Sequence, residues 1–406
     1  MLMFADSPQD QLSLQDCCND LRQHHRTSLS KVGLHKRFNK TSLSFIKAVF
    51  AEQMAAKLEI SELENRWKAF SGVMIADSCK FSLPEVFNNQ YPPLGGCRGG
   101  RSLMNIQYSF DLKDGNWQYL EFTSARENDQ SYSRKTFDTI AENTLYLRDL
   151  GFVIHDYLLE VVNKSAFFLN RLHPCCKPVF SDTGKAIDWK GLYHRMIANG
   201  ESKYEAEVTI GTGKKALCCR LIAVPVPHEV WSERIRKGKK QSKGHGYVQS
   251  EEYKNRSRFS IFITNVPSTI FQTGDVMEIY RLRWQIETIF KTWKSLYQIH
   301  RVKAVKIERL HCQLIAKFIL ILINWKIYRY INQLVQQGSA DHACSIWKVV
   351  KLTLKADYAL RRIISGKTSF KTWAKKTVYP ILQFLIVEPK KGRVPAFIIE
   401  LNGFLA

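Results

Sequence analysis

The sequence predicts an α/β protein in which a mixed sheet is flanked by helical regions. Three observations predict this class. Apolar residues recur at helical spacing before residue 70 and again after about residue 273. Short apolar runs and turn signals alternate with helical segments between residues 72 and 172. An apolar content of 45% over 406 residues is enough for a folded protein of two or three domains.

The first 70 residues are predicted to form a helical domain. Helical periodicity covers residues 9–23, 28–38 and 41–59, and Ser or Thr stands at cap-like positions before the second and third segments. The two helices around "FNKTS" resemble a basic helix-turn-helix, which is a DNA-binding arrangement. A small helical bundle without that role is the alternative, because the same spacing is common in all-α segments.

Residues 72–172 predict the element order β-β-β-α-β-α-β. "GVMIAD" is an apolar run that ends in Asp77, which is typical of a buried strand that delivers a side chain at its tip. The runs "LMNIQYSFDL" and "WQYLEFT" flank Asp114 and Gly115, a strong hairpin-turn signal. A later strand, "TLYLRD", ends on Asp149. Asp77 or Asp149 taken alone could be an ordinary turn residue.

Residues 173–256 interrupt this alternation. They contain the strand-like runs "EAEVTIGT" and "ALCCRLIAVPVP", followed by "RIRKGKKQSKGHG", which predicts an exposed loop. Regular structure returns with the strand "RFSIFITNV" and with one long helix from residue 273, which Thr273 or Asp275 is placed to cap. The remaining residues predict further helices.

Composition restricts the partners of the chain. Sixty Lys and Arg against 37 Asp and Glu give a formal charge of +23, which favours a polyanionic partner. The longest uninterrupted apolar run, residues 318–323, is too short to span a bilayer, so no membrane role is expected. The N-terminus lacks a secretory signal, so we expect a cytoplasmic protein. The ten cysteines form no CxxC pair and are expected to be reduced thiols.

The stretch "YRLRWQIETIFKTWK" places one acid among cations and aromatics on the predicted long helix. At helical spacing one stripe contains Tyr280, Arg283, Glu287, Lys291 and Lys294, and the opposite side is apolar. In one account Glu287 makes i,i+4 ion pairs on a solvated face. In the other account the cations and the tyrosine hold a phosphate backbone, and Glu287 faces it through a divalent metal.

Four of these residues, Tyr280, Arg283, Glu287 and Lys294, fit the spacing Y-x2-R-x3-E-x6-K. This motif resembles the signature of bacterial DDE transposases of the insertion sequence 4 family. "IADS" at Asp77, "RDLGF" at Asp149 and "FITNVP" before the signature helix match the order that this family shows. The resemblance covers roughly residues 30–335.

The resemblance implies a ribonuclease H-like core, a mixed five-stranded sheet with helices. It implies that Asp77, Asp149 and Glu287 are the catalytic residues and hold Mg2+, for which Mn2+ can substitute. The expected domains are a helical DNA-binding domain (1–70), two parts of the catalytic core (71–172 and 257–335), the β-rich insertion (173–256), and a helical C-terminal region (336–406) that could support dimerisation.

The implied partner is double-stranded DNA, both transposon ends and target, cut by a homodimer through a hairpin. The implied DNA contacts are made by Tyr280, Arg283, Lys291 and Lys294. Trp231 could stack on a flipped base, and Trp189 is a second candidate for this role. In the basic run that follows Trp231, the expected phosphate contacts are made by Lys237, Lys239 and Lys240. Two alternatives stay open: a transposase-derived DNA-binding protein without catalysis, and a structure-specific nuclease on the same core.

Overall fold

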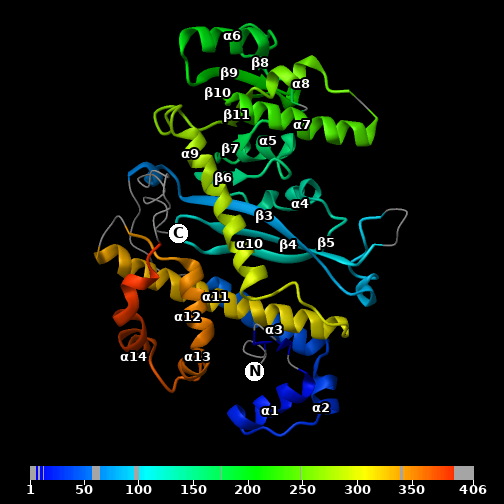
Figure 1. Ribbon diagram of the computed structural model, residues 1–406, viewed down its shortest axis with the longest axis vertical. Helices are drawn as coiled ribbons and strands as arrows, with labels where there is room; N and C mark the ends of the chain where they lie inside the picture. The colour runs from blue at the N-terminus through cyan, green and yellow to red at the C-terminus, as the bar shows by residue number, and fades with distance from the viewer. Residues whose placement is uncertain are drawn as a thin grey trace. The chain divides into compact units, whose positions relative to one another are not determined.

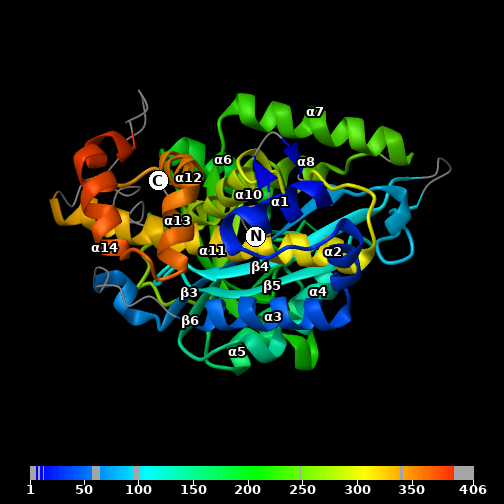
Figure 2. The ribbon, with the colours of Figure 1, turned by 90° about the horizontal axis from the view of Figure 1, so that it is seen from below.

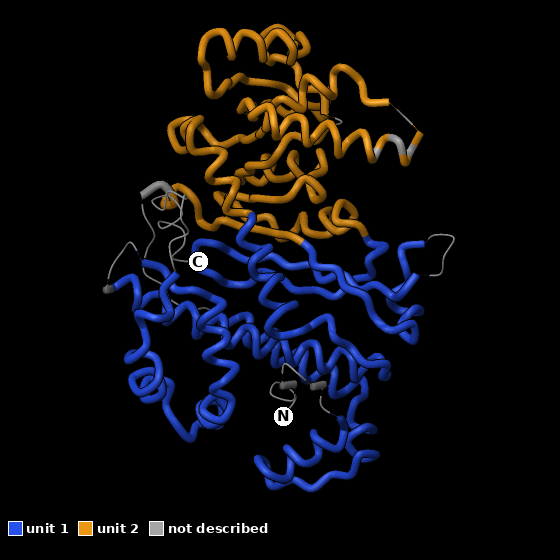
Figure 3. The backbone as a smooth tube through the Cα atoms, in the orientation of Figure 1, with its two compact units in different colours: residues 1–62, 78–127, 284–406 blue, residues 63–77, 128–283 orange. Residues whose placement is uncertain are grey.

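The computed structural model describes residues 6–7, 10–11, 13–56, 65–95, 100–174, 176–246, 248–338 and 342–387. The chain folds into two compact units (Figure 3). Unit 1 comprises Met1–Glu62, Ser78–Glu127 and Trp284–Ala406, and unit 2 comprises Leu63–Asp77 and Asn128–Arg283. The chain therefore leaves unit 2 directly after Asp77 and again directly after Arg283. The predicted α/β class is confirmed, because both units combine strands with helices.

Unit 2 is built on a mixed sheet with the strand order β3-β6-β7-β11-β10-β9-β8 (Figure 1). The pairs β3–β6 and β6–β7 are parallel, and the later pairs are antiparallel. The bounds are β3 Gly72–Ser82, β6 Thr144–Arg148, β7 Phe167–Arg171, β8 Val179–Phe180, β9 Tyr204–Ile210, β10 Leu217–Pro225 and β11 Phe259–Thr264. Strand β3 continues past the predicted end at Asp77 and enters unit 1.

The helices of unit 2 lie mostly between these strands in the sequence. They are α4 Asp129–Lys135, α5 His155–Asn163, α6 Trp189–Asn199, α7 His228–His245, α8 Glu251–Arg256 and α9 Val276–Arg281. Short 3-10 turns cover Asn65–Ala69, Phe137–Thr139 and Gly213–Lys215.

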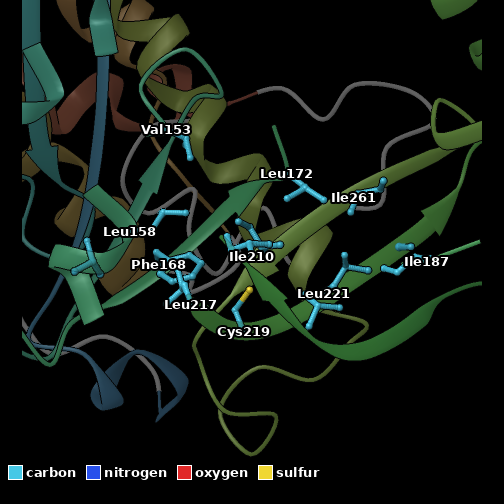
Figure 4. Packing of buried hydrophobic residues seen from close by; sticks show 14 of the residues in the cluster. Val153, Leu158, Phe168, Leu172, Ile187, Ile210, Leu217, Cys219, Leu221 and Ile261 are labelled. Carbon is cyan, nitrogen blue, oxygen red and sulfur yellow. The ribbon is translucent and has the colours of Figure 1, made fainter. Parts of the chain in front are cut away.

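One hydrophobic core runs through unit 2 (Figure 4). It joins Leu158 of α5 and Phe168 of β7 to Ile210, Leu221 and Ile261 of β9, β10 and β11. The strands of the predicted insertion therefore extend the same sheet and share its core.

The basic run "RIRKGKKQSKGHG" was expected to be a loop, and this expectation is wrong. It belongs to α7, a single helix of 18 residues (Figure 2). Lys, Arg and Gln are good helix formers. Gly238, inside this helix, is explained by close packing. A Cβ at Gly238 would lie 2.1 Å from Nε2 of Gln249 and 2.9 Å from the hydroxyl of Tyr253. Gly238 thus permits the close approach of the segment that contains α8.

Unit 1 contains the hairpin of β4 (Leu103–Asp111) and β5 (Trp117–Ser124), and its strand order is β5-β4-β3. The predicted turn at Asp114 and Gly115 is confirmed. The other described elements of unit 1 are α1 Leu14–His25, α2 Lys31–Arg37, α3 Lys40–Ala55, α10 Gln285–Ser295, α11 Ile307–Gly338, α12 Ile346–Lys355, α13 Asp357–Ile364 and α14 Phe370–Trp373, with the short pair β1 Asp6–Ser7 and β2 Asp10–Gln11 and shorter turns at Glu85–Phe87, Ala374–Val378 and Tyr379–Leu385.

Aromatic side chains fix α10 in the core of unit 1. Trp293 of α10 is almost fully buried, and its ring centroid lies 4.9 Å from that of Tyr108 in β4 and 4.9 Å from that of Phe318 in α11. Trp117 of β5 completes the cluster at 5.8 Å from Trp293. The apolar side predicted for this helix is therefore confirmed as a core-facing surface.

The three predicted N-terminal helices are present with shifted bounds, and residues 10–11, which were predicted to be helical, form the strand β2 instead. Ser30 caps α2, while Asn39 rather than a Ser or Thr caps α3, and Phe38 and Asn39 form the short turn between these two helices. An ion pair of 2.9 Å between Asp20 of α1 and Arg361 of α13 joins the N-terminal helices to the C-terminal region. Among the described residues one helix, α11, is long and apolar enough to span a bilayer, and 78% of its most apolar window is buried inside the protein.

The hairpin turn docks onto α11 through Gly115, which adopts a left-handed conformation with φ 68°. Trp325 donates its indole N–H to the Gly115 carbonyl oxygen at 2.7 Å. A Cβ at this position would lie 1.4 Å from Nη1 of the buried Arg329. The turn therefore needs glycine for its backbone conformation and for the approach of α11.

We predict that Gly115→Ala lowers the free energy of unfolding by about 2 to 4 kcal/mol, from left-handed strain plus overpacking. Gly184→Ala is the matched control, because Gly184 has φ 66° but nothing within 4 Å of its Cβ position. It should cost about 1 kcal/mol. Urea unfolding of both variants measures the difference, and equal losses would show that the docking of the turn contributes nothing.

Candidate active site

Asp77 and Asp149 each come directly after the last paired residue of two neighbouring parallel strands. The β3–β6 ladder runs in register from Gly72 with Thr144 to Ala76 with Arg148, and each aspartate is the next residue along the chain, Asp77 still within β3 and Asp149 just past the end of β6. Paired positions of parallel strands face the same side of a sheet, and neighbouring strands lie about 4.8 Å apart. Asp77 stands inside β3 rather than at its end, but it is the first residue after the pairing with β6.

Arg283 joins these two carboxylates. Its Nη1 lies 3.2 Å from Oδ2 of Asp77, and its Nη2 lies 3.5 Å from Oδ1 of Asp149. The guanidinium side chain is only 7% exposed, against 19% for Asp77 and 44% for Asp149. Salt screens such a partly buried group much less than a surface charge. One guanidinium therefore contacts both acids within unit 2 and offsets part of their joint negative charge.

Tyr280 lies one turn before Arg283 and is buried rather than open to solvent. Its hydroxyl donates to the backbone oxygen of Arg148 at 3.4 Å, and its ring packs 5.3 Å from Phe262 of β11. Burial raises the pKa of Tyr280 to about 12, so the phenol stays protonated at neutral pH. The expectation of a surface stripe is thus wrong for Tyr280 and Arg283, because this part of the helix packs on the strands that carry the acids.

The predicted long helix is interrupted at the signature. Helix α9 ends at Arg281, one 3-10 turn covers Leu282–Trp284, and α10 starts at Gln285. The expected capping does not occur at its start: Asp275 makes no side-chain cap bond, and the hydroxyl of Thr273 donates to Glu205 instead. The interruption coincides with the passage of the chain from unit 2 into unit 1.

The later residues of the signature belong to unit 1. Glu287 is exposed in the first turn of α10, four residues after Arg283. Lys291 is exposed, with its Nζ 5.9 Å from the ring centre of Trp347. Lys294 is half-buried and donates to the backbone oxygen of Lys80 at 3.1 Å.

The two tryptophans considered for base stacking both pack inside unit 2. The indole N–H of Trp231 donates to the backbone oxygen of Lys254 at 3.0 Å, and the guanidinium of Arg258 lies 4.2 Å from its ring centre. Trp189 is buried against Phe259. The structure thus favours the packing interpretation for both residues.

Helix α7 presents three of its lysines to solvent. Trp231 and the half-buried Arg234, which donates to the backbone oxygens of Ser257 and Phe259, fasten the helix to the unit. The three lysines proposed for phosphate contact are all exposed, and the first pairs with Glu233 at 2.7 Å; they are Lys237, Lys239 and Lys240. These exposed cations therefore belong to a helix whose first turns are held in place by Trp231 and Arg234.

The sequence reasoning missed two residues, one that follows Arg283 in the chain and one that precedes Asp149. Trp284 is 61% exposed, and the other tryptophans in the described part of the chain are buried or half-buried. Four residues after Tyr280, it falls on the same side of a helical projection, which is the signal that could have found it. The buried Arg148 donates to the hydroxyls of Ser133 at 2.8 Å and Thr136 at 3.0 Å and so fixes the strand end before Asp149; no local pattern reveals this role.

The acids are suitable ligands for a hard divalent cation, which prefers carboxylate oxygens. In the described parts of the chain no cluster of three or more His, Cys, Asp or Glu side chains has an arrangement that could hold a metal ion. Asp77 and Asp149 form a two-carboxylate part of such a site, with Arg283 between them. A cation that binds the same two oxygens, Oδ2 of Asp77 and Oδ1 of Asp149, must displace this guanidinium.

The chain is similar to known proteins over most of its length. The family model described as "Transposase DDE domain" matches residues 68–323, which include both aspartates and the signature helix. The transposase for insertion sequence element IS231F of Bacillus thuringiensis subsp. israelensis is 27% identical over 402 residues, covering 90% of this chain and 83% of the relative.

Two further relatives carry the same kind of name. The transposase for IS1151 of Clostridium perfringens is 30% identical to this chain, over an alignment that covers 73% of this chain and 66% of the relative. The transposase for IS421 of Escherichia coli is 30% identical to this chain, over an alignment that covers 76% of this chain and 78% of the relative.

Proposed function

We propose that this chain, which belongs to the transposase DDE domain family, binds the terminal inverted repeats of an insertion sequence and catalyses metal-dependent DNA cleavage and strand transfer. Its relatives are named as transposases of insertion sequence elements. The observation that carries the catalytic proposal is the pair Asp77 and Asp149. These acids follow the last paired residues of two neighbouring parallel strands, and an arginine of the signature joins them.

The finer fold assignment is a ribonuclease H-like core. Three strands in sequence are followed by helix, strand, helix and strand. Unit 1 has the order β5-β4-β3 and unit 2 continues it as β3-β6-β7, with β4–β5 antiparallel and the two later pairs parallel. This topology and the motif Y-x2-R-x3-E-x6-K support placement in the insertion sequence 4 family.

In this proposal Asp77, Asp149 and Glu287 hold Mg2+, and Mn2+ can substitute. Glu287 follows Arg283 by about one helical turn along the chain, which supports its role as the third carboxylate. The bound metal supplies an activated water or 3′-hydroxyl and stabilises the leaving oxygen of the phosphodiester. The acids fix the ions, and Arg148 fixes the strand end that carries Asp149.

The cations of the chain hold the DNA backbone. A formal charge of +23 supports binding of a polyanion, and the exposed lysines of α7 are one surface for it. We assign DNA binding also to the helices of residues 1–70, and pairing of two copies to residues 336–406. Lys291 and Lys294 of α10 contact phosphates, while Arg283 and Tyr280 reach them only after leaving their buried positions. The site of action is bacterial DNA in the cytoplasm.

If cleavage proceeds through a hairpin, a base beside the break leaves the stack and needs an aromatic surface. Trp231 and Trp189 are packed inside unit 2, whereas Trp284 is exposed beside Arg283. We therefore assign this stacking role to Trp284 in place of the two tryptophans that the sequence suggested.

Replacing any catalytic carboxylate should separate DNA binding from chemistry. Glu287→Gln, Asp77→Asn and Asp149→Asn should each lower end cleavage in Mg2+ by about 10³-fold or more while end binding remains within about twofold. Asp156→Asn is the control, because Asp156 is an exposed residue of α5 that pairs with Lys215. Cleavage and strand transfer by paired ends are the measurement. A Glu287→Gln protein that still cuts would refute the triad, and cutting without joining would indicate a nuclease.

The lysines of α7 should contribute to the salt dependence of binding. Changing Lys237, Lys239 and Lys240 together to Ala should make the slope of log affinity against log salt shallower by about 2 to 3, because up to three phosphate contacts are lost. The control removes the same charge from other exposed positions of unit 2: Lys177, Lys185 and Lys214. Equal slopes for the two triple variants would exclude a specific role for α7.

Trp284→Ala should weaken binding to transposon-end DNA by about 5- to 100-fold, which corresponds to the loss of one stacked base. The loss should disappear on an end that lacks the base at the flipped position, because no stacking partner is then present. Ile197→Ala, which removes a large exposed apolar side chain of α6, is the control. A loss that persists on the abasic end would show that Trp284 does not stack on this base.

A further inference from the structure

The contact of Arg283 with both acids suggests a role that neither DNA binding nor catalysis assigns to it. We propose that Arg283 is an internal counter-cation, which occupies the Asp77–Asp149 pair in the metal-free protein and competes with the divalent cation for these carboxylates. The inference rests on the proposed function, because it takes the two acids as metal ligands.

Electrostatics explains why such a residue is needed. Two carboxylates that follow the last paired residues of neighbouring strands repel each other, and a cation between them offsets this repulsion. Arg283 presents one nitrogen to each acid, which the planar fork of a guanidinium permits and the point charge of a lysine does not. It thereby keeps the two acids close together before a metal arrives.

The distances indicate a contact that can be exchanged. Charge-assisted N–H···O bonds at their best measure about 2.7 to 2.9 Å. The two contacts of Arg283 measure 3.2 and 3.5 Å, and Asp149 is nearly half exposed. A small divalent cation, which approaches carboxylate oxygens to about 2.1 Å, can replace the guanidinium from the solvent side.

The backbone around Arg283 is suited to movement. Arg283 lies in the 3-10 turn Leu282–Trp284, between α9 and α10. Hydrogen bonds of a 3-10 turn have poorer geometry than those of an α-helix, and such a turn inside a helix often marks a hinge. The guanidinium leaves the acids by rotation of its side chain, and a 3-10 turn allows the backbone to adjust as it does so. The released guanidinium is then available for a phosphodiester, the anion that the proposed substrate supplies.

Competition predicts that removing Arg283 tightens metal binding. Mn2+ binding to the full-length protein without DNA can be followed by electron paramagnetic resonance of the free ion. We expect Arg283→Gln to bind Mn2+ about tenfold or more tightly than the unchanged protein, because one close positive charge is lost. Arg281→Gln removes the same charge from an exposed position two residues earlier and should leave the affinity unchanged. Equal affinities for Arg283→Gln and the unchanged protein would overturn the proposal.

Two further variants make the result decisive. Arg283→Lys keeps the charge but cannot bridge both acids, so it should bind Mn2+ severalfold more tightly than the unchanged protein. If Arg283→Gln does not fold, as judged by circular dichroism, the lysine variant decides: an affinity no tighter than that of the unchanged protein overturns the proposal.

Adding Asp77→Asn to the arginine variant separates the proposal from the function on which it rests. Loss of the Mn2+ site in the double variant shows that the acids bind the metal. If the site is lost but Arg283→Gln and Arg283→Lys bind no more tightly than the unchanged protein, the counter-cation role alone is wrong. If Asp77→Asn has no effect on Mn2+ binding in either background, the two-aspartate metal site of the proposed function is wrong, and the counter-cation role falls with it.

Discussion

Two carboxylates on neighbouring strands repel each other, and the guanidinium of Arg283 stands between them at 3.2 and 3.5 Å. The surrounding structure serves this arrangement. The in-register pairing of β3 with β6 places Asp77 and Asp149 directly after the last paired residues of the two strands. Arg148 is tied to Ser133 and Thr136, and the hydroxyl of Tyr280 reaches the Arg148 backbone. These contacts hold the acids where one cation, from the protein or from solvent, can serve both.

Two residues of the candidate site lie where the chain passes from unit 2 into unit 1. Strand β3 enters unit 1 directly after Asp77, and the signature helix does so directly after Arg283. A carboxylate and its counter-ion thus lie at the ends of the unit 2 segments. The next turn of the signature, with Trp284 and Glu287, already belongs to unit 1. Along the signature, Tyr280 and Arg283 are therefore buried, whereas Trp284 and Glu287, which follow them, are exposed.

Local patterns predicted most elements of the fold. The apolar runs that end at Asp77 and Asp149, the turn at Gly115 and the core-facing side of α10 could all be inferred, because strand and helix periods are properties of neighbouring residues. Glycine-rich composition misled at α7, where Gly238 serves close packing rather than a loop. Helices α6 and α8 were missed within a segment that was expected to be rich in strands.

The site was predicted only in part, for a physical reason. Spacing placed Tyr280, Arg283 and Glu287 on one side of a helix but could not indicate what that side contacts. The hydrogen bond from Arg283 to Asp77 joins residues 206 positions apart, and no periodicity reports such a contact. The burial of Tyr280 and the exposure of Trp284 likewise depend on the strands that the helix covers. The types of residue at the site were therefore predictable, and their pairing was not.

The central claim is that one position between Asp77 and Asp149 is occupied either by Arg283 or by a divalent cation. Crystals of the protein with transposon-end DNA and Mn2+, measured at a wavelength where Mn2+ scatters anomalously, test it most directly. The account predicts an anomalous peak about 2.1 Å from oxygens of both aspartates, with the Arg283 side chain turned away from them. A peak that lies elsewhere, or a guanidinium still joining the two acids beside a bound metal, would contradict it.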